Sequence, residues 1–187
     1  ALLTAPSASA QGAYTVGWGL NADYQVSPVP TNAVSNVTAI AAGYFHSLAL
    51  VDGRVWAWGK NTSGQTNVPV AAQSSVAEIA AGAAYSMARR SDGTVVVWGV
   101  GAVTNVPASA SGVSAIAAGE AHALALKSGG IVAWGDNTYN QTNVPVELTS
   151  GVTAIAAGGY YSMALKNGGV QVFGIAATND DAGTIRS

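Results

Sequence analysis

His46 and His122 are the side chains of this sequence best suited to acid–base or metal chemistry. Each stands three residues after a glycine in a repeated segment, and Tyr85 and Tyr161 stand at the same place in the other two copies. No acidic residue keeps register with them, although a histidine ligand or general base normally needs an orienting partner. Histidine and tyrosine both join an apolar ring to a polar tip, so we expect a structural position that hydrogen-bonds a neighbouring unit.

Serine follows this position in three copies and alanine, at Ala123, in the fourth. That substitution argues against a nucleophilic serine, and the sequence holds no Gly-x-Ser-x-Gly elbow. The chain has no cysteine, which excludes disulfides, thiolate zinc sites and cysteine nucleophiles. We therefore predict no catalytic residue, no metal and no cofactor.

Composition excludes further classes. Charged residues make up 9% of the 187 residues, against roughly a quarter in ordinary domains, and 49% are hydrophobic. The net charge of −2 argues against a nucleic-acid binder, which needs a basic surface to neutralise phosphates. High apolar content with low charge also disfavours disorder. No apolar run approaches the roughly 18 residues of a membrane-spanning helix.

A segment of seven residues recurs four times and indicates how the chain is organised. Its copies begin at Val37, Val76, Val113 and Val152, at spacings of 39, 37 and 39 residues. A Trp-Gly or Phe-Gly pair follows each copy, and Thr-Asn-Val-Pro follows the first three pairs, as at 66–69. Self-similarity at a period of about 40 residues is typical of solenoids and propellers.

Each unit is interpreted as a set of short strands. In the first unit, residues 37–42, 46–51 and 54–58 are the predicted strands, and Asp52-Gly53 predicts a tight hairpin turn between the last two. The Asn-Val-Pro segment is expected to form a short fourth strand at an edge, where proline needs no donor. We therefore predict an all-β fold, a β-propeller-like array of about four to five four-stranded blades with a repeat of about 39 residues.

The first unit resembles a known repeat family. Its residues read Ile-Ala-Ala-Gly-Tyr-Phe-His-Ser-Leu-Ala-Leu (40–50), Asp-Gly-Arg-Val-Trp-Ala-Trp-Gly (52–59) and Asn-Thr-Ser-Gly-Gln-Thr-Asn-Val-Pro (61–69). This order is similar to the regulator of chromosome condensation repeat. Over residues 16–174 the resemblance is closest to a secreted bacterial branch that includes the propeller-type β-lactamase inhibitory protein. It implies a propeller, usually of seven blades, that works by binding other proteins.

The chain is shorter than seven such units require. Its length corresponds to about 4.8 units, so we expect a piece of a longer propeller, a small ring, or an open arc whose edges pair with other copies. The expected divisions are a signal-peptide remnant or disordered tail (1–13), a repeat domain (14–174) and a C-terminal tail or closing strand (175–187). The repeat domain divides into a partial unit, 14–36, and the units 37–75, 76–112, 113–151 and 152–174.

Positions filled by one residue type in every unit are expected to serve the scaffold. An aromatic ring precedes the glycine of each Trp-Gly or Phe-Gly pair, and we predict that these rings pack between blades. A glycine ends each first strand and is interpreted as an obligatory backbone position. These structural positions are Trp18, Trp58, Trp98, Trp134, Phe173, Gly43, Gly82, Gly119 and Gly158.

Positions that vary between units are expected to be free for a partner. They concentrate after the first strand and after the Trp-Gly pair, two loops that share one end of an up-and-down meander. Exposed aromatics on one face are typical anchors of protein contacts, although such rings also cover neighbouring loops. In the inhibitory branch the first of these loops carries aromatic contacts, which Phe45 and Tyr160 match and Ala84 and Ala121 do not. The predicted partner-binding residues are Tyr24, Tyr44, Phe45, Glu120, Tyr139 and Tyr160.

We therefore expect a non-enzymatic protein-binding or structural module that contacts partners, or copies of itself, through one loop face and the blade edges. A secreted inhibitor of an enzyme such as a β-lactamase is one alternative, and a carbohydrate-binding propeller is another. The expected partner is protein, with no nucleic acid and no membrane insertion. Ala8-Ser9-Ala10 fits a signal-peptidase site, so we expect export to the extracellular space, cell surface or particle surface.

Overall fold

The computed structural model describes residue 19 and residues 21–31 and 35–174. Within these residues the chain forms four antiparallel sheets of three strands each, and the strands of each sheet follow one another in the sequence. The strands are β1 (Val37–Ala42), β2 (His46–Val51), β3 (Arg54–Gly59), β4 (Val76–Ala81), β5 (Tyr85–Arg90), β6 (Val95–Gly99), β7 (Ala115–Ala118), β8 (His122–Lys127), β9 (Gly130–Gly135), β10 (Val152–Ala157), β11 (Tyr161–Lys166) and β12 (Gly169–Gly174). Three short 3-10 turns connect them, η2 (Val70–Ala72), η3 (Ala102–Thr104) and η4 (Val146–Thr149).

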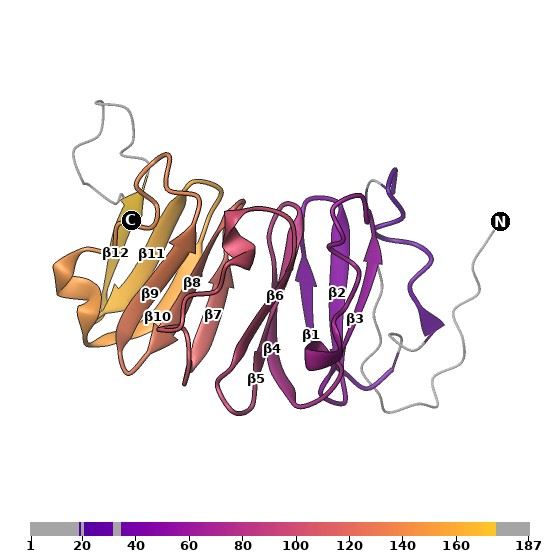
Figure 1. The fold of residues 1–187 in the computed structure, drawn as a ribbon, viewed down its shortest axis with the longest axis horizontal. Coiled ribbons are helices and arrows are strands. Elements are labelled where there is room, and N and C mark those ends of the chain that lie inside the picture. The colour runs from indigo at the N-terminus through magenta and orange to yellow at the C-terminus, as the bar shows by residue number, and fades with distance from the viewer. Residues whose placement is uncertain (1–18, 20, 32–34, 175–187) are drawn as a thin grey trace.

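The four sheets stand side by side as an open row of blades (Figure 1). The first strands of successive blades, β1, β4, β7 and β10, are neighbours along the row, as they are at the axis of a propeller. The predicted all-β array of repeated blades is confirmed.

Tight turns join the second and third strands of each blade. Asp52 and Gly53 both have positive φ, 49° and 73°, and the pairs at 128–129 and 167–168 repeat this geometry. Two consecutive positive φ angles define the turn that suits the twist of a two-stranded hairpin. The turn of the second blade is longer, because Arg90 and Thr94 bracket it and only Gly93 is left-handed.

The Asn-Val-Pro segments are not strands, so the expectation of a fourth strand is wrong for the described residues. The amide of Val68 donates to the Thr66 carbonyl two residues earlier, and Val106 and Val144 repeat this contact. The proline that follows has no N–H, so neither residue can donate to a ladder. Each valine instead packs its side chain against the core between two blades.

The hydrophobic core lies between successive blades rather than inside each one. Between the first and second blades, Leu48 and Leu50 pack with Ile79 and Trp98. Equivalent clusters fill the next two interfaces, although Arg89 stands at the Leu50 position of the second blade. A single sheet therefore buries its apolar faces only against its neighbours, as in other repeat proteins.

The repeated aromatic lies in these interfaces and also makes a polar contact. Trp98 and Trp134 are buried, and their Nε1–H groups donate to the carbonyls of Gln65 and Val103 at 2.9 and 2.8 Å. Trp58 donates in the same way to Gln25 at 2.9 Å. Phe173 is buried in the last interface without such a donor, and Trp18 lies outside the described residues.

The glycine that ends each first strand lies under an aromatic ring. A Cβ built on Gly82 would overlap the ring of Tyr85, and a Cβ on Gly43 would overlap the ring of His46. The equivalent atoms of Gly119 and Gly158 would meet the rings at 122 and 161. The ring three residues further on therefore needs this position to lack a side chain.

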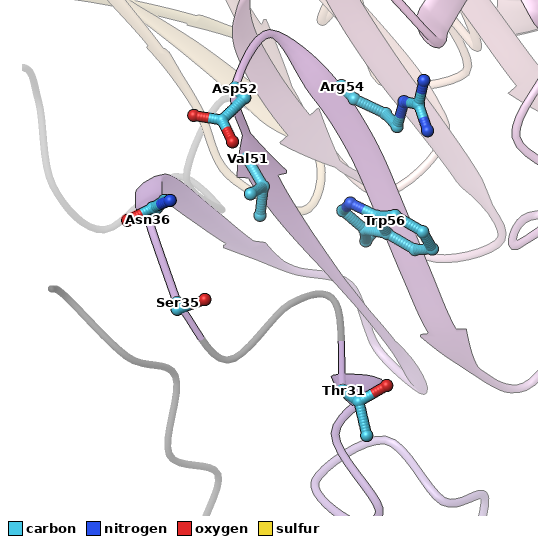
Figure 2. A pocket seen from close by; sticks show the side chains of 7 residues that line it. All are labelled: Thr31, Ser35, Asn36, Val51, Asp52, Arg54 and Trp56. Carbon is cyan, nitrogen blue, oxygen red and sulfur yellow. The ribbon is translucent and has the colours of Figure 1, made fainter. Parts of the chain in front are cut away.

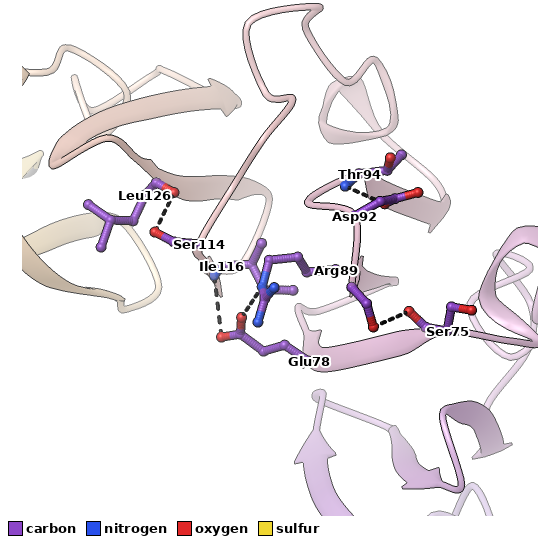
Figure 3. Close-up of polar contacts among 9 residues, drawn as sticks. Ser75, Glu78, Arg89, Asp92, Thr94, Ser114, Ile116 and Leu126 are labelled. Carbon is purple, nitrogen blue, oxygen red and sulfur yellow. Dashed lines mark hydrogen bonds and ion pairs between the residues drawn. The ribbon is translucent and has the colours of Figure 1, made fainter.

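The second blade carries a charged pair where the other blades carry alanine and leucine. Arg89 Nε donates to Glu78 Oε2 at 2.8 Å, and Glu78 Oε1 accepts the amide of Ile116 in the next blade at 3.3 Å (Figure 3). At the paired positions of the first blade stand Ala39 and Leu50. The pair thus connects two blades and serves the scaffold.

Candidate functional site

Two sets of loops meet at one end of the blades, as the meander requires. In the first blade the amide of Lys60, after the third strand, donates to the carbonyl of Phe45, between the first two strands, at 2.8 Å. Val100 and Asp136 make the equivalent bonds to Ala84 and Ala121. The variable positions of both loops therefore share one surface, which we call the loop face.

Five of the six predicted partner-binding residues form a connected group on the loop face. Tyr44 Oη donates to Glu120 Oε2 at 2.9 Å, linking the first blade to the third. The Tyr44 ring meets the Phe45 ring edge to face at 6.3 Å between centroids, and the Tyr139 and Tyr160 rings are 5.1 Å apart. All four rings are exposed, Tyr44 by 54%. We call Tyr44, Phe45, Glu120, Tyr139 and Tyr160 the loop-face cluster.

The sixth residue, Tyr24, lies at the margin of this cluster. Lys60 Nζ is 4.7 Å from the centroid of the Phe45 ring and 4.0 Å from Asp23, the neighbour of Tyr24. Tyr24 is 69% exposed and has a φ of 60°, a left-handed conformation that is rare for a bulky residue. The sequence analysis did not identify Lys60 and Asp23 as residues that contact this surface.

Glu120 influences two tyrosines from different blades. Its hydrogen bond with the Tyr44 hydroxyl raises the pKa of that group above its ordinary value of 10. A side-chain hydrogen bond with Glu120 raises the pKa of the Tyr160 hydroxyl as well. Both shifts arise because a nearby carboxylate disfavours a second negative charge. The loop-face cluster is thus coupled through one acidic side chain, and both tyrosines stay neutral hydroxyl donors at neutral pH.

A cavity of about 200 Å³ opens beside Glu120 where the four first strands end. Alanine and glycine from all four blades form most of its wall, together with Tyr44 and Glu120. A larger cavity, of about 380 Å³, lies at the other side of the first blade around Arg54, Trp56 and the Asp52 turn (Figure 2). Its lining includes Thr31 and Ser35, between which the sequence runs through residues that the structure does not describe, and we assign it no role.

The two histidines lie in the interfaces between blades, paired with serines of the next blade. His46 Nε2 is 2.9 Å from Ser86 Oγ, and His122 Nε2 is 3.0 Å from Ser162 Oγ. Both serines donate to backbone carbonyls, at Gln65 and Gln141, each at 2.7 Å. Since the serine proton is committed to a carbonyl, the histidine must be the donor through Nε2–H.

These pairs are sealed from solvent and carry no catalytic geometry. His46, Ser86, His122 and Ser162 are all at most 1% exposed. Burial lowers the pKa of His46 to about 4 and also lowers that of His122, because a buried ring disfavours the charged form. No three metal-ligating side chains gather among the described residues. The sequence analysis missed one signal. A serine stands 40 residues after each histidine, Ser86 after His46 and Ser162 after His122.

Tyr85 makes the equivalent contact between blades without a serine partner. Its hydroxyl donates to the backbone carbonyls of His122 and Gly119 at 2.6 and 3.2 Å, and Ala123 packs in the same cluster. The longer tyrosine reaches the next blade directly, so the serine hydroxyl is not needed there.

Repeated sheets that share their cores, with variable loops at one end, define a propeller-type repeat protein. A family model described as "Regulator of chromosome condensation (RCC1) repeat" matches residues 37–65 and 113–141. The match thus covers parts of the first and third complete units of this chain.

Proteins with known names are also similar to this chain. The Arabidopsis thaliana "RCC1 domain-containing protein RUG3, mitochondrial" is 30% identical over 106 residues, which cover 44% of this chain and 24% of that protein. The crystal structure of Prp20p from Saccharomyces cerevisiae superimposes with a TM-score of 0.70 at 21% identity, covering 89% of this chain and 54% of Prp20p. The same yeast protein bound to Kap60 gives a TM-score of 0.64 at 22% identity, covering 78% and 45%.

The chain therefore spans about a quarter of its curated relative and about half of the yeast structure. At these identities the two structures establish the fold. No helix among the described residues is long and apolar enough to cross a membrane.

Proposed function

We propose that this chain is a non-enzymatic protein-binding module and that the loop face is its contact surface. The observation that carries the proposal is the loop-face cluster, in which four exposed aromatic rings from three blades are joined in one surface. Aromatic side chains dominate the energetic centres of protein interfaces, because they bury a large area at a small cost in entropy.

The contrast between scaffold and loop face supports this proposal. The repeated aromatics Trp98, Trp134 and Phe173 are buried between blades, whereas the four aromatics of the loop-face cluster are exposed. The yeast relative Prp20p is described together with its binding to Gsp1p and histones, and another structure of it with Kap60. Protein binding by an RCC1-type propeller is thus a role that a related fold performs.

The experiment is to pan a displayed peptide library on the chain and to measure the selected binders against matched variants. Phe45→Ala and Tyr160→Ala are expected to weaken binding about 30-fold each, the equivalent of about 2 kcal/mol for an anchor residue. The control is Val70→Ala with Val146→Ala, which removes exposed apolar side chains from the η2 and η4 turns, away from the loop face. Binders that lose no affinity to the two loop-face variants would refute the proposal.

A second candidate, head-to-tail self-association, is favoured by the exposed face of the last blade. Tyr161 is 39% exposed there, whereas the equivalent Tyr85 is 1% exposed under the next blade. Leu165, Val170 and Val172 are exposed on the same blade, although their counterparts lie in the interfaces between blades. Light scattering after size exclusion tests this candidate with Leu165→Glu as the variant. A monomer at every concentration in the unsubstituted chain would remove it.

Three further proposals from the sequence remain. Inhibition of a class A β-lactamase would be a special case of loop-face binding, and unchanged enzyme activity at micromolar chain concentration would retire it. Export rests on Ala8-Ser9-Ala10, which lies outside the described residues, and remains a prediction. A carbohydrate ligand would also use the aromatic rings, and binding of a glycan array in preference to peptides would favour it.

A further inference from the structure

The cavity on the loop face has a wall almost without side chains. Apart from Tyr44 and Glu120, each residue that lines it is an alanine or a glycine. Among these described lining residues, the Glu120 carboxylate is therefore the one charged group. Its volume of about 200 Å³ is sufficient for the end of one long side chain and too small for a folded segment.

Glu120 is held in place by three blades. Its amide donates to the carbonyl of Gly159 in the fourth blade at 3.3 Å, and its carbonyl accepts the amide of Ala83 in the second at 3.0 Å. Tyr44, from the first blade, binds one carboxylate oxygen at 2.9 Å. A carboxylate accepts about four hydrogen bonds, so capacity remains for a further donor. The acid is thus pre-organised before any partner arrives.

The charges of the surrounding loops favour a cation. The described loops of this face carry three carboxylates, Asp23, Glu120 and Asp136, and one ammonium, Lys60. The Lys60 ammonium lies 4.0 Å from the Asp23 carboxylate and 4.7 Å from the centroid of the Phe45 ring. The loop face has a net negative charge, centred on a half-buried acid between aromatic rings. Such a combination attracts cations both through the carboxylate and through the ring faces.

Building on the proposed function of the loop face, we propose that the cavity receives a cationic side chain, an arginine or lysine, from a protein partner. Glu120 accepts hydrogen bonds from the guanidinium or ammonium, and the rings of Tyr44 and Tyr160 flank it. Arginine suits the site better, because its planar fork pairs with a carboxylate through two parallel hydrogen bonds. The loop-face cluster would then supply both the apolar anchors and the charge that selects the partner.

The test uses peptides selected on the unsubstituted chain, synthesised with their arginine or lysine intact. For each arginine peptide a second version carries citrulline, which is the same shape without the charge. Affinity is measured by calorimetry against the chain, Glu120→Gln and the control Glu147→Gln, an exposed acid on η4. Thermal unfolding of each variant verifies its fold, and Glu120→Gln retains an acceptor for Tyr44.

The proposal expects selected peptides to contain arginine or lysine and to lose about tenfold or more in affinity on Glu120→Gln, but not on Glu147→Gln. Citrulline should cause the same loss, and rising salt should weaken binding to the unsubstituted chain more than to Glu120→Gln. Peptides that depend on Phe45 but bind Glu120→Gln equally well would overturn the cation site while leaving the loop face as a binding surface. Peptides that depend on neither would overturn both.

Discussion

Replacing Tyr24 with glycine should make the protein more stable while weakening its binding. Tyr24 has a φ of 60°, and the equivalent positions in the first and third complete units are Gly64 and Asn140, with φ of 76° and 62°. Glycine and asparagine tolerate this left-handed conformation, whereas a bulky side chain does not. The backbone of the repeat demands a positive φ here, and tyrosine adopts it under strain.

The magnitude follows from two opposing effects. A left-handed L-residue costs about 1–2 kcal/mol, which glycine would relieve. Glycine loses more conformational freedom on folding, at about 0.5–1 kcal/mol. The 69% exposure of Tyr24 means that removing its ring loses little packing. We therefore expect a net gain of about 0.5–1 kcal/mol, which corresponds to a rise in Tm of about 1–4 °C for a chain of this size.

The assay is urea unfolding together with hydrogen exchange of residues 21–31. Tyr24→Asn, which copies Asn140, should also gain stability. The control is Tyr139→Gly, because Tyr139 packs against Tyr160 at 5.1 Å and has no left-handed backbone. That change should lower stability. If Tyr24→Gly lowers stability as much as the control, Tyr24 is not strained and the expected gain in stability is refuted.

Three further predictions concern the scaffold. Burial lowers the pKa of His46 to about 4 and lowers that of His122, so both contribute stability above pH 6.5 that is lost as pH falls toward 4. Urea unfolding at pH 7 and 4.5 should reveal a loss of about 2 kcal/mol from His46, and a flat profile would contradict the burial argument. Gly82→Ala should lower Tm, at a cost of about 1–3 kcal/mol, because the new Cβ would overlap the Tyr85 ring. The control Gly169→Ala, whose Cβ would meet its nearest atom at 3.6 Å, should change Tm little. Equal effects of the two substitutions would refute the ring contact. Trp98→Phe should cost about 1 kcal/mol in urea unfolding by removing its Nε1–H donor, and no cost would mean that this hydrogen bond adds nothing.

The array of blades was predictable from the sequence because the same segment recurs four times at nearly constant spacing. Strand positions, hairpin turns and the aromatic in the interface all follow from apolar patterns and turn residues that recur with the same spacing. The fourth strand was not predictable in this way. Val68 carries an apolar side chain as a strand residue would, and only its local hydrogen bond to Thr66 shows that its amide is not free for a ladder.

The loop face was predicted as a surface, but its internal contacts were not. The bond from Tyr44 to Glu120 spans 76 residues and passes over the second blade, whose loop consists of Ala83 and Ala84. Small residues in one blade thus let its two neighbours meet, a relation that depends on how the row curves. The spacing in the sequence predicts at which end of a blade each residue lies. Which of these residues contact one another depends on how the row of blades curves.

The interfaces between blades qualify the rule that variable positions are free for a partner. The ring position varies between histidine and tyrosine, and the contacting position one unit later varies between serine and alanine. In the three described interfaces between blades these residues are all buried, namely His46, Ser86, Tyr85, Ala123, His122 and Ser162. They vary together: His46 with Ser86, His122 with Ser162, and Tyr85 with Ala123. A shorter ring needs a hydroxyl to complete the hydrogen bond between blades, and a longer one does not. Variation that is matched across an interface therefore indicates scaffold, and only the unmatched variation at the loop ends indicates a surface for binding.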